Sequence, residues 1–294
     1  MNNLIKANAL NNNVLIYCLN SKELVEQARI AHDLYPTSLA ALGRVLSVTA
    51  IMGKMNKNEK DKVTVTINGK GPIGTIMAEA RSNGNVRGFC GDNEIYLKYN
   101  DTNKLAVGLA VGTDGYLKVT KDLGMKDSFS GQVALQTGEI GDDFAYYFMI
   151  SEQIPSVVSC GVLVDIDNTT LSAGALLIQV MPNATEDDIV AVENLIAKLQ
   201  PISSMFKETD DPKTIVKSLF DDVEIIEESN VQYLCDCDKE RFKAGLTTLK
   251  MEDLQEILQD DEKVEIKCEF CNKIYHFDKH DLEVIIDFKK SFNR

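Results

Sequence analysis

The chain has 294 residues, 44% of them hydrophobic, and a formal net charge of −14. This length allows two or three domains with ordinary cores, and the negative charge disfavours binding to the phosphate backbone of nucleic acids. No apolar run approaches eighteen residues, and residues 1–6 (MNNLIK) lack the apolar core of a signal peptide. We therefore expect no membrane span and a cytoplasmic location.

Charge and glycine are unevenly distributed along the chain. Residues 1–180 carry 16 basic and 18 acidic side chains, residues 181–230 carry 4 and 12, and residues 231–294 carry 11 and 15. Of the 18 glycines, 17 precede residue 181. These shifts predict three parts: a core domain over residues 1–180, an acidic helical linker over 181–230 and a small cysteine-bearing domain over 231–294.

The first part is predicted to combine a few helices with many short strands. An amphipathic helix is expected over residues 21–34 with Ser21 as its N-cap, a more apolar one over 38–55 and a third over 142–153. Apolar alternation and short apolar runs predict strands at 63–67, 74–80, 85–89, 105–111, 115–120, 131–137, 157–165 and 175–181. Clustered strands with Gly or Asn turns indicate an α+β fold with antiparallel sheets.

The segment after residue 181 is predicted to be helical. Thr185 and Asp188 resemble a capping box at the start of a helix that Pro201 ends, and residues 211–220 form a second, shorter helix. The apolar stripe of the first helix comprises Ile189, Val192, Leu195, Ile196 and Leu199. With 12 acidic and only 4 basic side chains, this segment repels itself and is expected to open when its packing is relaxed.

The third part carries four cysteines in two close pairs. Cys235 and Cys237 form a Cys-x-Cys pair, and Cys268 and Cys271 form a Cys-x-x-Cys pair after thirty intervening residues. Zinc takes four tetrahedral ligands and thiolates suit it, so this spacing predicts one Zn²⁺ held by the four cysteines. Helices are expected over residues 238–249, 251–258 and 279–286, and strands over 264–267 and 274–277.

Such a site connects redox chemistry to folding. Structural zinc contributes about 10–16 kcal/mol, so its removal is expected to unfold this small part. Two sulfurs that are close in the chain can also be oxidised to a disulfide with little chain movement. A ring that small is strained, and strained, exposed disulfides have the higher potentials of regulatory bonds. The four cysteines therefore allow two states, a reduced one with the metal bound and an oxidised one without it.

Other potential metal ligands are interpreted as structural. His276 and His280 follow Cys271 and could compete for zinc, but four thiolates are already present. The three remaining cysteines stand singly in apolar stretches, where a free thiol behaves as a small hydrophobe. They are Cys18, Cys90 and Cys160.

Two loops resemble catalytic or cofactor motifs. Residues 69–74 (GKGPIG) match the letters of a dinucleotide fingerprint, but a strand follows them, so we interpret them as a hairpin turn. Residues 165–169 (DIDNT) resemble a phosphatase nucleophile pair but lack the required doubly wound sheet, and are interpreted as a turn. Three histidines offer no Ser/His/Asp grouping, so no enzymatic activity is expected.

Five further stretches are spread over the three parts. Most of them are weak family signatures alone, but together, in this order and chain length, they are highly specific. They are residues 36–44 (PTSLAALGR), 112–124 (GTDGYLKVTKDLG), 138–147 (GEIGDDFAYY), 151–155 (SEQIP) and 233–241 (YLCDCDKER). With the cysteine pairs, they make the whole chain resemble the redox-regulated thirty-three-kilodalton heat-shock chaperone family. Asp238 stands where that family often has serine, and aspartate is an equally good N-cap.

The resemblance implies an ATP-independent holdase that binds unfolded client proteins during oxidative stress. It implies that the reduced, zinc-bound form is inactive. Oxidation would pair Cys235 with Cys237 and Cys268 with Cys271, release zinc, unfold the tail and linker, expose apolar surface and favour a homodimer.

Two alternatives from other classes are a thiol–disulfide oxidoreductase and a zinc-ribbon nucleic-acid binder. The cysteine pairs motivate the first, but no thioredoxin-like βαβ pattern surrounds them. The acidic tail disfavours the second.

Overall fold

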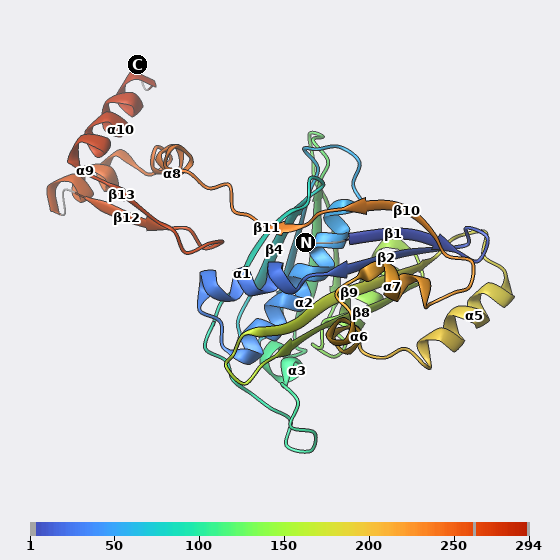
Figure 1. Cartoon of the computed structure of the whole chain (residues 1–294). Helices are drawn as coiled ribbons and strands as arrows, with labels where there is room; N and C mark the ends of the chain where they lie inside the picture. Colours follow the sequence, from blue (N-terminus) through green and yellow to red (C-terminus); the bar gives the residue numbers. More distant parts are fainter. Residues whose placement is uncertain (1–3, 261–262, 293–294) are drawn as a thin grey trace. The chain divides into compact units, whose positions relative to one another are not determined.

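The computed structural model describes residues 4–260 and 263–292 (Figure 1). The chain divides into two compact units, Met1–Leu234 and Cys235–Arg294. Within the described residues, the first unit contains a five-stranded and a six-stranded sheet, and the second contains a two-stranded sheet. The prediction of an α+β fold with antiparallel sheets is confirmed.

The five-stranded sheet joins strands from both ends of the first unit. Its order is β10-β1-β2-β9-β8, and all neighbours are antiparallel. The strands are β1 (Leu4–Ala9), β2 (Val14–Asn20), β8 (Ser156–Val164), β9 (Thr170–Val180) and β10 (Glu224–Ser229). The sequence pattern predicts β8 and β9 but not the other three. In β2 most residues are buried, so the polar alternation that marks a half-exposed strand is missing.

The six-stranded sheet is antiparallel except for a short added strand at one edge. Its order is β11-β5-β4-β3-β6-β7, and only β11 and β5 are parallel. The strands are β3 (Lys62–Asn68), β4 (Ile76–Arg81), β5 (Asn85–Cys90), β6 (Tyr116–Asp122), β7 (Phe129–Ala134) and β11 (Gln232–Tyr233). The predicted alternation in β3 is confirmed, since Val63, Val65 and Ile67 are fully buried.

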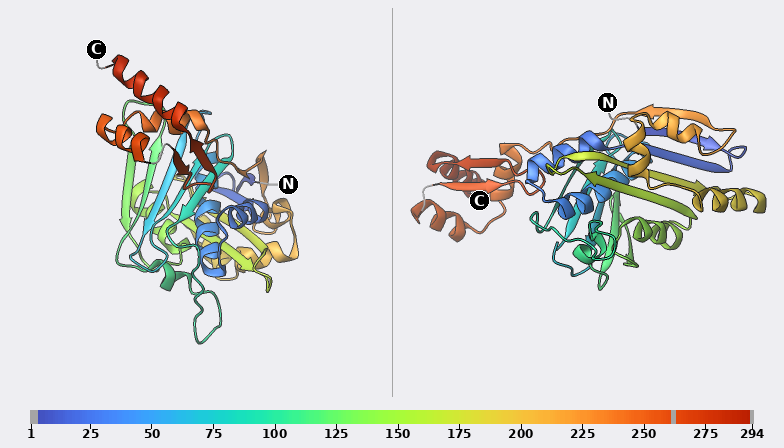
Figure 2. Two further views of the ribbon diagram at one scale, coloured as in Figure 1. Left: turned by 90° about the vertical axis from the view of Figure 1, so that its left-hand side faces the viewer. Right: turned by 60° about the horizontal axis from the view of Figure 1, so that its bottom comes forward.

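Helix α2 (Pro36–Lys54) is the centre of the core and packs against strands of both sheets (Figure 2). All its residues except Arg44 and Lys54 are buried. It begins two residues earlier than predicted because Pro36 occupies the first helical turn, where a missing N–H is harmless. Among the described residues, α2 alone is long and apolar enough to cross a membrane, but 89% of that stretch is buried inside the protein.

Helix α1 (Lys22–His32) has Ser21 at its N-cap position, as predicted, but the serine makes no side-chain capping bond. Its hydroxyl lies 2.7 Å from the hydroxyl of Ser47 on α2. The side chain of Asn20 accepts the hydrogen bond from Lys22 N instead. The serine therefore ties α1 to α2 rather than capping its own helix.

The strand predicted over residues 105–111 is wrong, because this segment contains the short helix α3 (Val107–Val111). The loop after β3 packs on it backbone to backbone: Gly71 N donates to Val111 O at 2.9 Å. A Cβ on Gly71 would lie 2.3 Å from Ala110 O, so only glycine fits there. The predicted helix over 142–153 is confirmed as α4 (Gly141–Tyr147) followed by the π-helical turn η1 (Phe148–Glu152).

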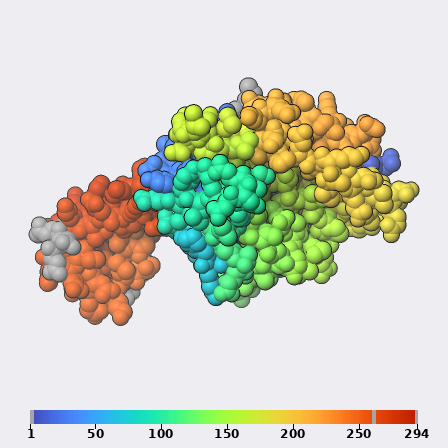
Figure 3. All heavy atoms as spheres, turned by 90° about the horizontal axis from the view of Figure 1, so that it is seen from below, coloured from blue at the N-terminus to red at the C-terminus, as the bar shows by residue number. Residues whose placement is uncertain are grey.

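The chain after β9 covers the outer face of the five-stranded sheet with three helices, which are drawn in yellow to orange in Figure 3. They are α5 (Glu186–Ile196), α6 (Ile202–Glu208) and α7 (Pro212–Lys217). The capping box of Thr185 and Asp188 and the start at Pro212 are confirmed. Sequence reasoning missed α6, which is short and has no side-chain cap.

The apolar stripe predicted for α5 is only shallowly packed. Val192 is buried, whereas Ile189 and Ile196 remain 37% and 44% exposed. The deeper contacts come from Phe206 on α6 and from Val216 on α7, which are 3% and 0% exposed. The covering segment is therefore held mainly by α6 and α7.

The second unit is small and mostly helical. Its elements are α8 (Lys239–Leu246), α9 (Met251–Asp260), β12 (Val264–Lys267), β13 (Ile274–Phe277) and α10 (Lys279–Phe292). Both strands have the predicted bounds, and α10 extends six residues beyond the predicted end at residue 286. The core includes Leu254, Phe277 and Ile285, all fully buried.

Candidate metal centre

Cys235 and Cys237 lie in an extended segment that leads into α8. Asp238 is the N-cap of this helix, and its carboxylate accepts a 2.7 Å hydrogen bond from Arg241 N. An aspartate at this place stops the helix from extending back over the cysteines. The sulfurs of the pair are therefore presented by extended chain beside a fixed helix start.

Cys268 and Cys271 lie in the turn that joins β12 to β13. Cys268 N donates to Lys273 O at 2.9 Å, and Asn272 N donates to Cys268 O at 2.7 Å. Asn272 adopts a left-handed conformation with φ of 59°, which asparagine tolerates better than most residues. This closed turn holds both sulfurs on the same side of the hairpin.

The four sulfurs converge on one point. The Sγ atoms of Cys235 and Cys268 are 3.8 Å apart, and those of Cys237 and Cys271 are 3.4 Å apart. All four lie within 4.8 Å of one another. Sulfurs bound at about 2.3 Å to a tetrahedral zinc ion lie roughly 3.8 Å apart, so this arrangement fits such an ion. The four cysteines could therefore hold one metal ion.

Tyr275 on β13 completes the surroundings of the cluster. Its hydroxyl lies 2.7 Å from the carbonyl oxygen of Cys237 and 3.1 Å from the sulfur of the same residue. Its ring packs against Phe242 of α8, with ring centroids 4.8 Å apart. Sequence reasoning missed this role, for which the only signal is its inward place on a strand next to the cysteine turn.

These surroundings give the sulfurs unequal acidity. Burial opposes ionisation of Cys237, but hydrogen bonds from Tyr275 and Cys271 favour its thiolate and bring its pKa below the ordinary value. Burial raises the pKa of Cys268 and Cys271. Cys237 therefore ionises more readily than either cysteine of the β12–β13 turn.

The histidines stand apart from the cluster. His276 points away on the exposed side of β13, where Nδ1 lies 3.2 Å from Glu265 Oε1. His280 is exposed at the start of α10. Within residues 4–260 and 263–292, the group that could hold a metal ion contains only the four cysteines.

The three single cysteines lie on strands of the first unit, as expected. Cys18 is buried in β2, and burial raises its pKa. Burial also raises the pKa of Cys90 and of Cys160 to about 12. These thiols are therefore poorly suited to redox chemistry at neutral pH.

The remaining motifs are connections between antiparallel strands. The 69–74 loop joins β3 to β4, and residues 165–169 form the turn between β8 and β9. The Cys-x-x-Cys pair lies between two strands, not at the start of a helix as a thioredoxin-like motif would require. Both loops are thus turns between antiparallel strands, as predicted.

The chain matches one protein family over nearly its whole length. The family model described as Hsp33 protein matches residues 2–278. A protein named 33 kDa chaperonin from Bacillus licheniformis is 40% identical over 288 residues, covering 98% of this chain and 99% of its own. Proteins of the same name from Alkaliphilus metalliredigens and Clostridioides difficile are 42% and 41% identical, over 97% and 96% of this chain and 98% of each relative.

A solved structure supports the same assignment. The crystal structure of a 33 kDa chaperonin from Thermotoga maritima matches with a TM-score of 0.90 and 33% sequence identity, over 99% of each chain. Sequence and fold thus agree over both units. The chain belongs to the Hsp33 family of chaperones.

Proposed function

We propose that this chaperone is a redox-regulated, ATP-independent holdase that prevents aggregation of unfolded proteins in the cytoplasm and has no enzymatic activity. The observation that carries the proposal is the convergence of four cysteine sulfurs within 4.8 Å. They lie in a unit whose buried core contains few large side chains. A unit of that size needs a bound metal ion or a covalent cross-link to be stable.

The resting state is the reduced protein with one Zn²⁺ on Cys235, Cys237, Cys268 and Cys271. When bound, zinc keeps the sulfurs as thiolates and supplies about 10–16 kcal/mol of folding free energy. The chain's own contribution is positional: the β12–β13 turn and the start of α8 hold the sulfurs together, and Tyr275 orients Cys237.

Oxidation converts the two close pairs to disulfides, Cys235 with Cys237 and Cys268 with Cys271. Each pair gives two electrons to a peroxide, which is reduced to water as the sulfur–sulfur bond forms. All four sulfurs are near one another, so distance alone does not select this pairing. The short separation along the chain and the family resemblance support it. A disulfide sulfur is a poor metal ligand, so the oxidised cysteines would no longer hold an ion.

Loss of the metal unfolds the second unit, and on mild heating the covering segment follows. We treat residues 1–180, 181–230 and 231–294 as core, linker and switch, although the linker packs on the core in this state. When α5–α7 leave, the outer sheet face with Ile5, Ile16 and Ile178 becomes accessible. An exposed apolar surface of this kind binds other unfolded chains and favours a homodimer. Nucleic acids and membranes are not partners.

The test compares client aggregation with reduced, zinc-loaded protein and with protein treated with peroxide under mild heating. We expect suppression of aggregation to rise in step with zinc release and thiol loss. A triple Cys18→Ala, Cys90→Ala, Cys160→Ala variant is the matched control and should be activated normally. Zinc release without any gain in holdase activity contradicts the proposal.

A further inference from the structure

The outer strand of the five-stranded sheet has an uncovered backbone edge. β8 pairs on one side with β9 and has no neighbour on the other side in this sheet. Val180 N donates to Pro155 O at 3.0 Å, which fixes the register of the antiparallel ladder. Because the bonding direction alternates along a strand, the N–H and C=O groups of residues 158, 160 and 162 point away from β9.

These outward groups have no partner in the part of the chain that the structure describes. No backbone or side-chain hydrogen bond reaches the main-chain N–H or C=O of Val158, Cys160 or Val162 in residues 4–260 and 263–292. Long exposed edges are normally blocked by a charge, a proline or a covering loop. This one remains available for pairing with another extended chain.

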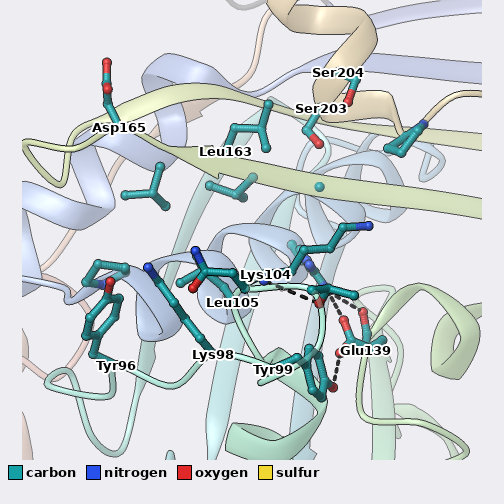
Figure 4. A pocket seen from close by; sticks show the side chains of 18 of the residues that line it. Tyr96, Lys98, Tyr99, Lys104, Leu105, Glu139, Leu163, Asp165, Ser203 and Ser204 are labelled. Carbon is teal, nitrogen blue, oxygen red and sulfur yellow. Dashed lines mark hydrogen bonds and ion pairs between the residues drawn. The ribbon is translucent and has the colours of Figure 1, made fainter.

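Part of this edge opens into a cavity of about 1000 Å³ rather than onto a flat surface. Residues 160–165 form one wall, and Figure 4 shows Leu163 and Asp165 on it. The loop with Tyr96 and Lys98 forms the opposite wall, and Ser203 at the start of α6 lies at one end. Val158 is outside the cavity, and its carbonyl oxygen lies close to Gly141 at the start of α4, so the edge is open within the cavity and covered beyond it.

The floor of the cavity is a hydrogen-bonded network centred on Glu139. Glu139 accepts hydrogen bonds from the hydroxyl of Tyr99 and from Arg44 Nη1, each at 2.6 Å, and from Gly108 N at 3.0 Å. The charges of Arg44 and Glu139 therefore compensate each other. The floor fixes the distance between the two walls but offers little free charge to a ligand.

The wall opposite β8 carries free positive charge. Lys98 and Lys104 are exposed, and neither forms an ion pair in the described residues. Lys98 lies 5.2 Å from the ring centroid of Tyr96. Asp101 and Asp165 also line the cavity, and the 2.7 Å hydrogen bond from Ile166 N leaves the charge of Asp165 in place. The rim thus carries as many carboxylates as lysines, and the lysines lie on the wall opposite β8.

We propose that this cavity binds an extended polypeptide segment as an added strand on β8, with an acidic side chain of that segment paired to Lys98 or Lys104. This inference rests on the proposed function and names where a client contacts the core. Alternating donors and acceptors at fixed spacing match a peptide backbone better than any small molecule. The aromatic ring of Tyr96, 55% exposed, offers packing to an apolar side chain of the segment.

Binding of a labelled peptide to the full-length, peroxide-treated protein tests the inference by fluorescence anisotropy, because the reduced form is the resting state. Residues 160–164 span roughly 16 Å at about 3.3 Å per residue, so a peptide of about seven residues is long enough. The probe alternates Val and Thr and carries one Glu. Its control has the same sequence with backbone N-methyl groups along one edge, and is expected to bind at least about tenfold more weakly because it cannot complete the ladder.

Two proline variants separate the cavity from the rest of the edge. Val162→Pro removes an outward N–H inside the cavity, and Val158→Pro removes one outside it. Proline is tolerated where a strand N–H faces away from the sheet. We expect Val162→Pro to weaken peptide binding by at least about tenfold and Val158→Pro by less than about twofold, with thermal unfolding measured for both.

If either proline variant fails to fold, reversing the charges of two exposed lysines still tests the inference. Lys98→Glu with Lys104→Glu changes only exposed side chains and should weaken binding of the Glu peptide about tenfold while restoring affinity for a Lys peptide. Equal binding of the N-methylated control, or no charge exchange, overturns the inference. The inference is also overturned if sedimentation shows a dimer that Val162→Pro abolishes and no peptide binds. In that case a second copy of the chain pairs with β8. Client aggregation assays on the same variants separate this failure from failure of the holdase proposal.

Discussion

The hydroxyl of Tyr275 reaches both the carbonyl oxygen and the sulfur of Cys237, at 2.7 and 3.1 Å. A group that contacts a metal ligand without being one controls how that ligand is oriented and how easily it ionises. Cysteine spacing reveals the ligands but not this contact, since it depends on how β13 and α8 meet. The sequence therefore predicts the four cysteines of the cluster, but it does not predict the contact of Tyr275 with Cys237.

Tyr275→Phe removes the hydroxyl and keeps the ring against Phe242. We expect zinc affinity to fall about tenfold, because Cys237 loses the hydrogen bond that orients it and favours its thiolate. Competition with a chromophoric chelator measures the change. Tyr96→Phe, at an exposed tyrosine of the first unit, is the matched control and should leave affinity unchanged. Equal affinities for both variants would show that the contact is incidental.

The pairing of the sulfurs after oxidation can be read by mass spectrometry. Trypsin cleaves after Lys267 and Lys273, so Cys268 and Cys271 share a peptide that contains neither Cys235 nor Cys237. We expect this peptide to lose two hydrogen atoms on peroxide treatment and to remain unlinked, because the three-residue separation favours closure within the pair. A peptide cross-linked to the Cys235 segment would contradict the proposed pairing.

At the scale of elements, α6 holds the covering segment to the sheet. The ring of Phe206 occupies the space above Gly174 of β9, where a Cβ would lie 2.3 Å from the ring. Asn20 donates from its side chain to Asp210 O at 2.9 Å, which fixes the chain after α6. By contrast, α5 exposes Ile189 and Ile196. The covering segment is therefore held firmly by α6 and α7 and only loosely by α5.

Phe206→Ala should release the cover without oxidation. Loss of a buried phenyl ring destabilises a packed site by about 3–5 kcal/mol, which exceeds what the shallow α5 contacts can replace. We expect the reduced, zinc-loaded variant to suppress client aggregation in the absence of peroxide. Ile196→Ala changes an exposed side chain of the same segment and should shift stability by less than about 0.5 kcal/mol, with no gain in activity. If the reduced Phe206→Ala variant stays inactive, release of the covering segment is not what activates the chaperone.

Two of the elements that the sequence failed to predict depend on contacts with distant residues. β3, β12 and β13 alternate along their own residues and were predicted closely. β10 is an acidic strand that exists because it pairs with β1, more than two hundred residues away in the chain. α3 was mistaken for a strand because its form is set by the loop at Gly71. Local pattern predicts local structure, and these elements are determined by distant partners.

At the scale of the whole molecule, backbone hydrogen bonds hold the chain in place just before the boundary between the two units. Gln232 N donates to Gly84 O and Leu234 N donates to Val86 O, both at 2.9 Å. Val231 beside them is fully buried. This short parallel pairing anchors the chain immediately before Cys235. Unfolding of the second unit is therefore expected to stop at residue 234 unless the first unit also loosens.

Hydrogen exchange during zinc removal tests that order. Under reducing conditions with a chelator, we expect α8–α10 to lose protection first, because their core depends on the metal. The amides of Gln232 and Leu234 should remain protected, as should β9. On mild heating, α5 should exchange next, since Ile189 and Ile196 leave it shallowly packed, and α6 and α7 should follow. Protection that disappears uniformly over both units, or that persists in α8–α10 without zinc, would show that the metal does not control a separate folding unit.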